Sequence, residues 1–274
     1  MLPTPCTSHV PYARVYEPAE DSFLLLDTLS SAGETAFLAG RFPSTDYGCP
    51  LVLEVGPGSG VVLAFVAAHA QALFARRDIL TLGIDVNGFA CRATVSTVAK
   101  AVAAAHADET KTTMAEAAGP VAGPGGEGKG GHGVFLGAVQ GDLTGAMRLG
   151  VVDVLVFNPP YVPTPELPAL LPASTPAPGG GAAFEEDSRL LALSYAGGKD
   201  GMETTDRLID ALPAALSERG CAYLLLCAQN KPEEVKERIR AMERGEWKAE
   251  TVGTSGKQAG WERLQIVRIW RDLE

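Results

Sequence analysis

The sequence predicts an α/β fold, in which a mostly parallel seven-stranded sheet carries helices on both faces and ends in an antiparallel hairpin. Short apolar runs alternate with helical stretches over most of the 274 residues, which is the order of a parallel sheet with crossover helices. The last two apolar runs have no room for a helix between them, so they should pair antiparallel. A glycine-rich turn, Gly56–Gly60, joins the first apolar run to a helix, as in open sheets that bind ligands.

Each element can be placed from the residue pattern. The first helix should begin near Pro18, because proline suits a first helical turn and because Glu20 and Asp21 suit the positive end of a helix dipole. Residues 31–48 are interpreted as an irregular connection. The strands are expected at 51–55, 79–85, 134–139, 151–157, 221–228, 247–252 and 264–270, and the later helices at 61–73, 88–105, 204–218 and 232–244.

The domain organisation is predicted to be a single domain over residues 16–274, preceded by a flexible arm at 1–15. Two insertions, at about 103–133 and 165–183, interrupt the alternating pattern. Residues 119–133 hold eight glycines and two prolines, so they cannot bury a core and are expected to be mobile. The second insertion follows a candidate substrate motif and is interpreted as a substrate loop.

Composition excludes some function classes. Hydrophobic residues make up 46% of the chain, which suffices for a core, and the net charge is −10. A protein that holds nucleic acid through its phosphates needs a basic footprint, so a nucleic-acid partner is not expected. The five cysteines include no C-x-x-C pair, and no apolar run is long enough to span a membrane. These features predict a cytoplasmic or nuclear protein with reduced thiols, no metal site and no membrane anchor.

The first candidate site is Glu54 with the glycines Gly56, Gly58 and Gly60, between a strand and a helix. Glycines let the backbone turn tightly and approach a ligand closely. A carboxylate at the strand end would repel a pyrophosphate, so the pattern favours a ligand with a positive charge or an amino group. The alternative is an ordinary tight turn.

Two further acids follow the next strands. Asp85 ends the second strand and could accept hydrogen bonds from both hydroxyls of a ribose. Asp142 follows the third strand and could accept from the amino group of an adenine, while Leu143 offers its backbone amide. Either acid could instead cap a turn or a helix.

The most specific motif is Asn158-Pro159-Pro160-Tyr161, which follows the fourth strand. The two prolines fix the backbone and force Asn158 toward an extended conformation. The side-chain carbonyl of Asn158 and a proline-fixed main-chain carbonyl can then both accept from one planar –NH₂ group. The ring of Tyr161 offers a face on which a flat group can stack.

These features together resemble the class I methyltransferases that use S-adenosylmethionine, whose fold is Rossmann-like. Within that superfamily, the chain is similar to the HemK-like release-factor glutamine methyltransferases of the eukaryotic and archaeal branch. The resemblance covers about residues 16–270 apart from the two insertions. It rests on four segments in the family's order, namely Tyr16–Ser22, Glu54–Gly60, Asn158–Tyr161 and Ala196–Gly201.

The resemblance implies an activity, a cofactor and partners. Family enzymes methylate the side-chain amide nitrogen of the glutamine in the Gly-Gly-Gln loop of a class-1 translation release factor, with S-adenosylhomocysteine as the other product. The eukaryotic enzymes work as a heterodimer with a small zinc-binding activator. By the same resemblance, Glu54 and the glycine turn would hold the methionine part, Ser22 would close over the cofactor, and Asp85, Asp142 and Leu143 would bind the nucleoside. Asn158, Pro159, Pro160 and Tyr161 would hold the glutamine amide, and Asn158 would also contact the cofactor.

Other activities are possible on the same scaffold. Adenine also presents an aromatic –NH₂, so the motif at Asn158 would serve N6-adenine methylation, but that reaction needs base flipping and usually a target-reading domain. A lysine methyltransferase must deprotonate an ammonium, and Asn158 is no base. A non-catalytic scaffold is the third alternative. No general base is assigned for the glutamine reaction.

The expected partner surface is the third strand, Val134–Val139. The sheet order usual in the superfamily places this strand at an edge, and it carries several large apolar side chains without lysine or proline. Such an edge is a template for another strand. We therefore expect the activator to pair with it, unless the glycine-rich insertion covers it.

Overall fold

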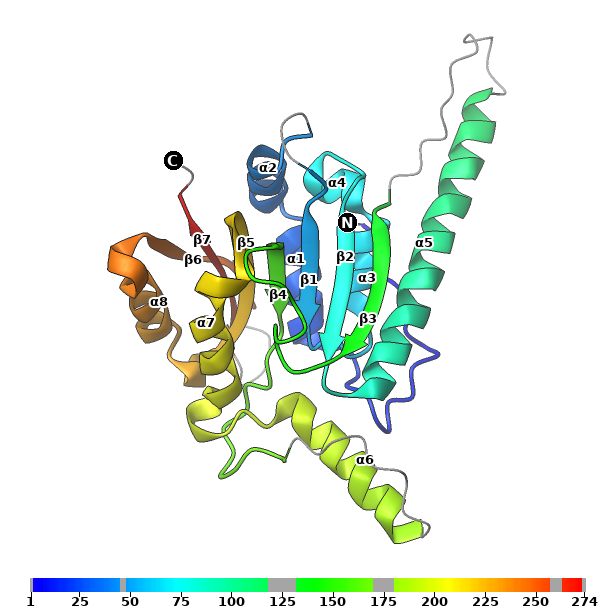
Figure 1. Cartoon of the computed structure of the whole chain (residues 1–274). Coiled ribbons are helices and arrows are strands. Elements are labelled where there is room, and N and C mark those ends of the chain that lie inside the picture. Colours follow the sequence, from blue (N-terminus) through cyan, green and yellow to red (C-terminus); the bar gives the residue numbers. More distant parts are fainter. Residues whose placement is uncertain (1, 45–47, 118–131, 170–179, 257–262, 273–274) are drawn as a thin grey trace.

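The computed structural model describes residues 2–44, 48–117, 132–169, 180–256 and 263–272. Seven strands form one sheet in the order β3-β2-β1-β4-β5-β7-β6 (Figure 1). Neighbours from β3 to β5 are parallel, whereas β7 is antiparallel to β5 and β6, which confirms the predicted topology. The strands are β1 (Leu51–Val55), β2 (Leu80–Asp85), β3 (Val134–Gln140), β4 (Val152–Phe157), β5 (Leu216–Cys227), β6 (Trp247–Thr254) and β7 (Leu264–Arg271).

Helices cover both faces of this sheet, as predicted, because side chains of a buried strand alternate between its two faces. Val154 and Val156 of β4 join the cluster formed by the first four helices, whereas Leu155 and Phe157 join the cluster formed by α7 and α8. The helices are α1 (Glu20–Leu29), α2 (Ala32–Arg41), α3 (Val61–Ala68), α4 (Ala70–Phe74), α5 (Gly88–Ala117), α6 (Gly180–Tyr195), α7 (Glu203–Ala215) and α8 (Pro232–Arg240).

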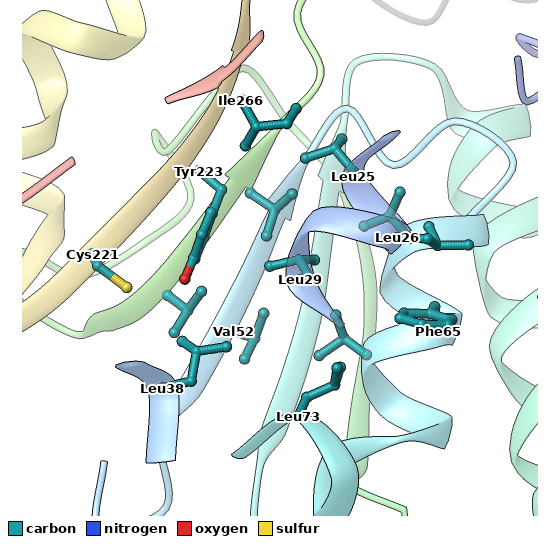
Figure 2. Close-up of a cluster of buried hydrophobic side chains, with 14 of the residues drawn as sticks. Leu25, Leu26, Leu29, Leu38, Val52, Phe65, Leu73, Cys221, Tyr223 and Ile266 are labelled. Carbon is teal, nitrogen blue, oxygen red and sulfur yellow. The ribbon is translucent and has the colours of Figure 1, made fainter. Parts of the chain in front are cut away.

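The larger core cluster fixes α1 on the sheet. Figure 2 shows Leu25 and Leu29 of α1 lying over Val52 of β1 and Tyr223 of β5, all of them buried. Burying a leucine side chain contributes about 1.5–3 kcal/mol relative to leaving it exposed. The N-terminus of α1 is therefore held firmly beside the strand ends, where the candidate site lies.

Helix α2 replaces the irregular connection expected at residues 31–48. The Ser31 hydroxyl accepts a hydrogen bond from the backbone N–H of Glu34 at 3.3 Å, and serine followed three residues later by glutamate is a known helix-start pattern. The helix carries Glu34 to a buried position, where its carboxylate accepts from Tyr223 Oη at 2.7 Å and pairs with Arg268 at 2.9 Å. This network ties α2 to β5 and β7.

The N-terminal segment also differs from the flexible arm that was expected. Val10 and Val15 are buried against Ala90 and Ala93 of α5. The side-chain amide of Asn87 donates to the carbonyl of Arg14 at 2.7 Å. The segment thus packs on the body of the domain and delivers Tyr16 to the strand ends.

The two insertions are described in part. Helix α5 continues through the first one as far as Ala117, beyond its expected end at residue 105, and its last turns extend beyond the amino ends of the strands (Figure 1). The expectations of a mobile insertion and a substrate loop fall mostly on residues 118–131 and 170–179, which lie outside the described residues. Helix α6, which follows the second insertion, was not predicted. No helix in the described part of the chain combines the length and hydropathy needed to cross a bilayer.

Candidate active site

A cavity opens at the carboxyl ends of β1, β2 and β4, where open α/β sheets bind ligands. It holds about 1210 Å³ of empty space, part of it continuous with solvent, and α6 and the N-terminus of α1 contribute to its wall. Figure 1 shows α6 lying across this end of the sheet. Most of the predicted site residues line it, namely Ser22, Glu54, Gly56, Gly58, Asp85, Asp142, Leu143, Asn158 and Pro160.

The glycines of the turn after β1 have two roles, one in the cavity wall and one in helix packing. Gly56, Gly58 and Gly60 all have positive φ, at +64°, +54° and +80°, which favours glycine. Gly56 and Gly58 line the cavity, but Gly60 is not among the described residues of its wall. A Cβ on Gly60 would lie 2.6 Å from the Cα of Thr94. In the structure, Gly60 therefore allows α3 and α5 to pack closely.

Glu54 is buried in the cavity wall, with 3% of its surface exposed. Its Oε2 has no hydrogen-bond partner, and no basic side chain in the described residues pairs with it. Burial raises the pKa of Glu54 to about 8, and the nearby charge of Asp85 raises it further. A buried acceptor without a counterion is costly, so this position suits a ligand that brings a positive charge or N–H donors.

Asp85 lies at the end of β2 and has a structural role as well as a place in the cavity. Its two oxygens accept from the backbone N–H of Asn87 at 2.8 Å and of Gly58 at 3.1 Å. Burial raises the pKa of Asp85 to about 6. The carboxylate thus locks the glycine turn onto β2 and still faces the cavity.

Asp142 and Leu143 form the wall beyond β3. Leu143 has a φ of +49°, so the chain turns sharply here and brings both residues to the cavity. Asp142 forms an ion pair with Arg207 of α7, which also lines the cavity. Arg207 is remote in sequence and belongs to no recognisable motif, so sequence reasoning missed it.

Asn158 is the residue of its motif that is best placed for a substrate. Its amide nitrogen donates to Asp21 Oδ2 at 2.9 Å, while its Oδ1 is buried and has no hydrogen-bond partner. Pro160 also lines the cavity, but Pro159 and Tyr161 are not among the described residues of the wall. The Tyr161 ring packs against the large core cluster, so its predicted stacking role is not seen in this arrangement.

The backbone of the motif is held by the loop at residues 196–201. A Cβ on Gly197 would overlap the carbonyl oxygen of Pro160, and a Cβ on Gly201 that of Tyr161. The side-chain amide of Asn230, which is itself buried, donates to the carbonyls of Tyr161 and Asp200, each at 3.1 Å. The glycines in this loop are therefore needed for close backbone approach, and Asn230 joins the two segments.

The cavity is acidic. Asp21, Glu54, Asp85 and Asp142 line it, and Arg207 is the one basic side chain in its described wall. Arg207 is already paired with Asp142. The remaining carboxylates favour a cationic ligand and oppose a polyphosphate.

Comparisons with known proteins identify relatives of the whole chain. The chain is 33% identical to "Methyltransferase HEMK2" of Mus musculus, over 98% of this chain and 96% of that protein. The chain belongs to the HEMK2 methyltransferase family. It is also 30% identical, over 99% of its length and 96% of the relative, to the protein named "eRF1 methyltransferase catalytic subunit mtq2" of Schizosaccharomyces pombe.

A solved structure supports the fold. The Mtq2–Trm112 complex of E. cuniculi matches with a TM-score of 0.50 and 22% identity, over 94% of this chain and 99% of the matched chain. No protein-family model matches the chain. This likeness supports the predicted fold, a mostly parallel seven-stranded sheet with an antiparallel C-terminal pair.

The raised carboxyl pKa values predict how stability depends on pH. An unfolded chain binds these protons only below about pH 4, whereas the folded protein keeps them up to about pH 6 at Asp85 and pH 8 at Glu54. The folded state binds more protons in this window, so the free energy of unfolding should fall as pH rises from about 4 to 8. We expect the melting temperature of the ligand-free protein to fall between pH 5 and 8.5.

Glu54→Gln should remove the part of that slope above pH 6 and leave the part due to Asp85. Glu17→Gln, at an exposed acid near the site, is the matched control and should keep the full slope. An equal slope in Glu54→Gln and wild type would contradict this account of Glu54.

Proposed function

We propose that this chain is the catalytic subunit of a heterodimer that methylates the glutamine of the Gly-Gly-Gln motif in a class-1 translation release factor. The methyl donor is S-adenosylmethionine. The observation that carries the proposal is Asn158 Oδ1, a buried acceptor without a hydrogen-bond partner on a residue that lines the cavity. The fission yeast relative is named an eRF1 methyltransferase, and the similar solved complex is described as methylating the eRF1 termination factor.

The residues of the cavity fit this cofactor. When bound, S-adenosylmethionine supplies a methyl group on a positively charged sulfur. Glu54, with its unpartnered oxygen, would accept from the ammonium of the methionine part. Asp85 would accept from the ribose hydroxyls, Asp142 and the Leu143 amide would meet the adenine, and Ser22 would lie over the methionine part.

The chemistry requires acceptors more than a base. An amide nitrogen is a weak nucleophile because its lone pair is delocalised into the carbonyl. Asn158 Oδ1 and a main-chain carbonyl held by Pro159 and Pro160 would accept its two N–H bonds and aim the lone pair into the cavity. The N–H becomes acidic only as the nitrogen gains positive charge, so positioning and electrostatics carry the catalysis. No histidine lies in the described wall of the cavity.

The proposed partner surface is the outer edge of β3. The strand pairs only with β2 in the described sheet, and Val134, Leu136 and Val139, here called the edge patch, are 52%, 54% and 43% exposed. Phe135 points the other way and packs against Ala64, Ala67 and Val98. An exposed apolar edge favours pairing with a second chain. The similar solved structure contains Trm112 as its partner, and a Trm112-type activator is the partner we propose.

Removal of the Asn158 side chain should abolish transfer and leave cofactor binding nearly intact. In single-turnover assays with the release factor, Asn158→Ala should lower the rate by about 100-fold or more, because a transition-state acceptor is lost. Cofactor affinity, measured by calorimetry, should change little. A release factor whose Gly-Gly-Gln glutamine is replaced, and a DNA substrate, are the negative controls. Full activity of Asn158→Ala, or methylation of DNA alone, would contradict the proposed function.

A charge in the edge patch should weaken the heterodimer without touching the cavity. Leu136→Asp would place an uncompensated charge in an apolar interface, which should raise the dissociation constant by about tenfold or more. Leu149→Asp is the matched control, because Leu149 is 77% exposed and lies outside β3. Co-purification with the activator from a coexpression system measures both. Equal recovery of the partner with the two variants would exclude the edge patch as the interface.

A further inference from the structure

We propose that Asp21 is a positioning residue, which holds the Asn158 amide with its carbonyl toward the substrate and strengthens that carbonyl as an acceptor. This inference rests on the proposed function, because it concerns the group that would receive the glutamine amide. Asp21 belongs to the first turn of α1, far from Asn158 in sequence, and the two meet only in the fold.

The contacts of Asp21 fix its orientation. Its side chain is buried, with 3% of the residue exposed. Oδ2 accepts from Asn158 Nδ2 at 2.9 Å and from Tyr16 Oη at 3.0 Å. Oδ1 accepts from the backbone N–H and the hydroxyl of Ser22, at 2.5 and 3.2 Å. Four donor groups from three residues thus hold the carboxylate in one place.

This carboxylate selects one of the two orientations of the Asn158 amide. An ionised carboxylate can only accept hydrogen bonds, so the amide nitrogen must face Asp21. The alternative orientation would set the Asn158 carbonyl against the carboxylate and lose the hydrogen bond. Oδ1 is therefore directed away from Asp21, and it is the atom that the structure leaves buried without a partner.

The charge of Asp21 also acts through Asn158. No basic side chain among the described residues pairs with Asp21, so its hydrogen bond to Asn158 is charge-assisted and lies in a buried environment. Such a bond polarises the amide and draws electron density onto Oδ1, as in a chain of cooperative hydrogen bonds. A stronger acceptor matters most when the donor it meets becomes more acidic.

The substrate nitrogen becomes such a donor during transfer. A bond forms between this nitrogen and the methyl carbon, and the carbon–sulfur bond breaks with its electron pair going to sulfur. The nitrogen gains positive charge and then loses one N–H proton to water, so the product is a neutral N-methyl amide and a neutral thioether. An acceptor polarised by Asp21 stabilises the developing charge more than it stabilises the bound substrate, which raises kcat.

The first test compares Asp21→Asn with Glu20→Gln. Both remove a carboxylate from the first turn of α1, but Glu20 is exposed and contacts no site residue in the described contacts. Asp21→Asn should lower kcat toward the release factor by about 10- to 100-fold, with the affinity for S-adenosylmethionine and the melting temperature little changed. Glu20→Gln should match wild type. Unchanged kcat in Asp21→Asn, or a loss that merely follows unfolding or lost cofactor binding, would overturn the proposal.

The second test reverses the polarity of the pair. Asn158→Asp alone would set two carboxylates against each other and should be nearly inactive. The double variant Asp21→Asn/Asn158→Asp restores one donor and one acceptor, with a carboxylate oxygen left toward the substrate. We expect the double variant to be more active than Asn158→Asp alone. Equal or lower activity would mean that the two residues are not coupled.

A third readout needs no substrate, so it separates this inference from the proposed function. In protein labelled with ¹⁵N-asparagine, the side-chain NH₂ signal of Asn158 should move when Asp21 is changed to Asn and stay in place in Glu20→Gln. If wild type methylates no release factor but this signal responds, the proposed function fails and the contact stands. If the signal does not respond, the positioning role fails.

Discussion

The site depends on acidic side chains that the fold buries at the carboxyl ends of the strands without giving them a counterion. Parallel strands end together, so Glu54 after β1 and Asp85 after β2 converge, and the N-terminus of α1 adds Asp21. Arg207, the one basic side chain in the described cavity wall, forms an ion pair with Asp142. The free energy that this burial costs is offset when a cationic ligand enters, which links the architecture of the sheet to the choice of a sulfonium cofactor.

The other requirement is a rigid acceptor for a planar amide, and it is met by contacts from three segments that are distant in sequence. Asp21 in α1 orients the Asn158 side chain, and Asn230 after β5 holds the Tyr161 carbonyl. The glycines of the 196–201 loop allow the backbones to approach closely. The amide nitrogen becomes acidic only as it gains positive charge, so no general base is needed before the attack. The protein therefore contributes fixed geometry and fixed dipoles.

Much of this could be predicted from sequence because local signals coincide with strand ends. The alternating apolar runs predicted the sheet. Short motifs located Glu54 and Asn158, and positions directly after strands indicated Asp85 and Asp142. Helix α2 was not predicted, although Ser31 and Glu34 form a helix-start pattern. Helix α6 was not predicted either, because its first residues fall within the second insertion. Arg207 and Asn230 could not be predicted, because their roles arise from tertiary contacts across many residues. The packing role of Gly60 could not be predicted either. Gly60 belongs to a motif typical of ligand-binding turns, but its close approach to α5 arises only in the fold.

The central claim is that buried acidic side chains without a counterion favour a cationic ligand. It can be tested by the number of protons released when the cofactor binds. Because the pKa of Glu54 is about 8 in the ligand-free protein, this group is mostly protonated at pH 7 and should ionise when an ammonium and a sulfonium enter. Titration calorimetry with S-adenosylmethionine at pH 7, in buffers of different ionisation enthalpy, should show release of about one proton. Identical binding heats in all buffers would contradict the account.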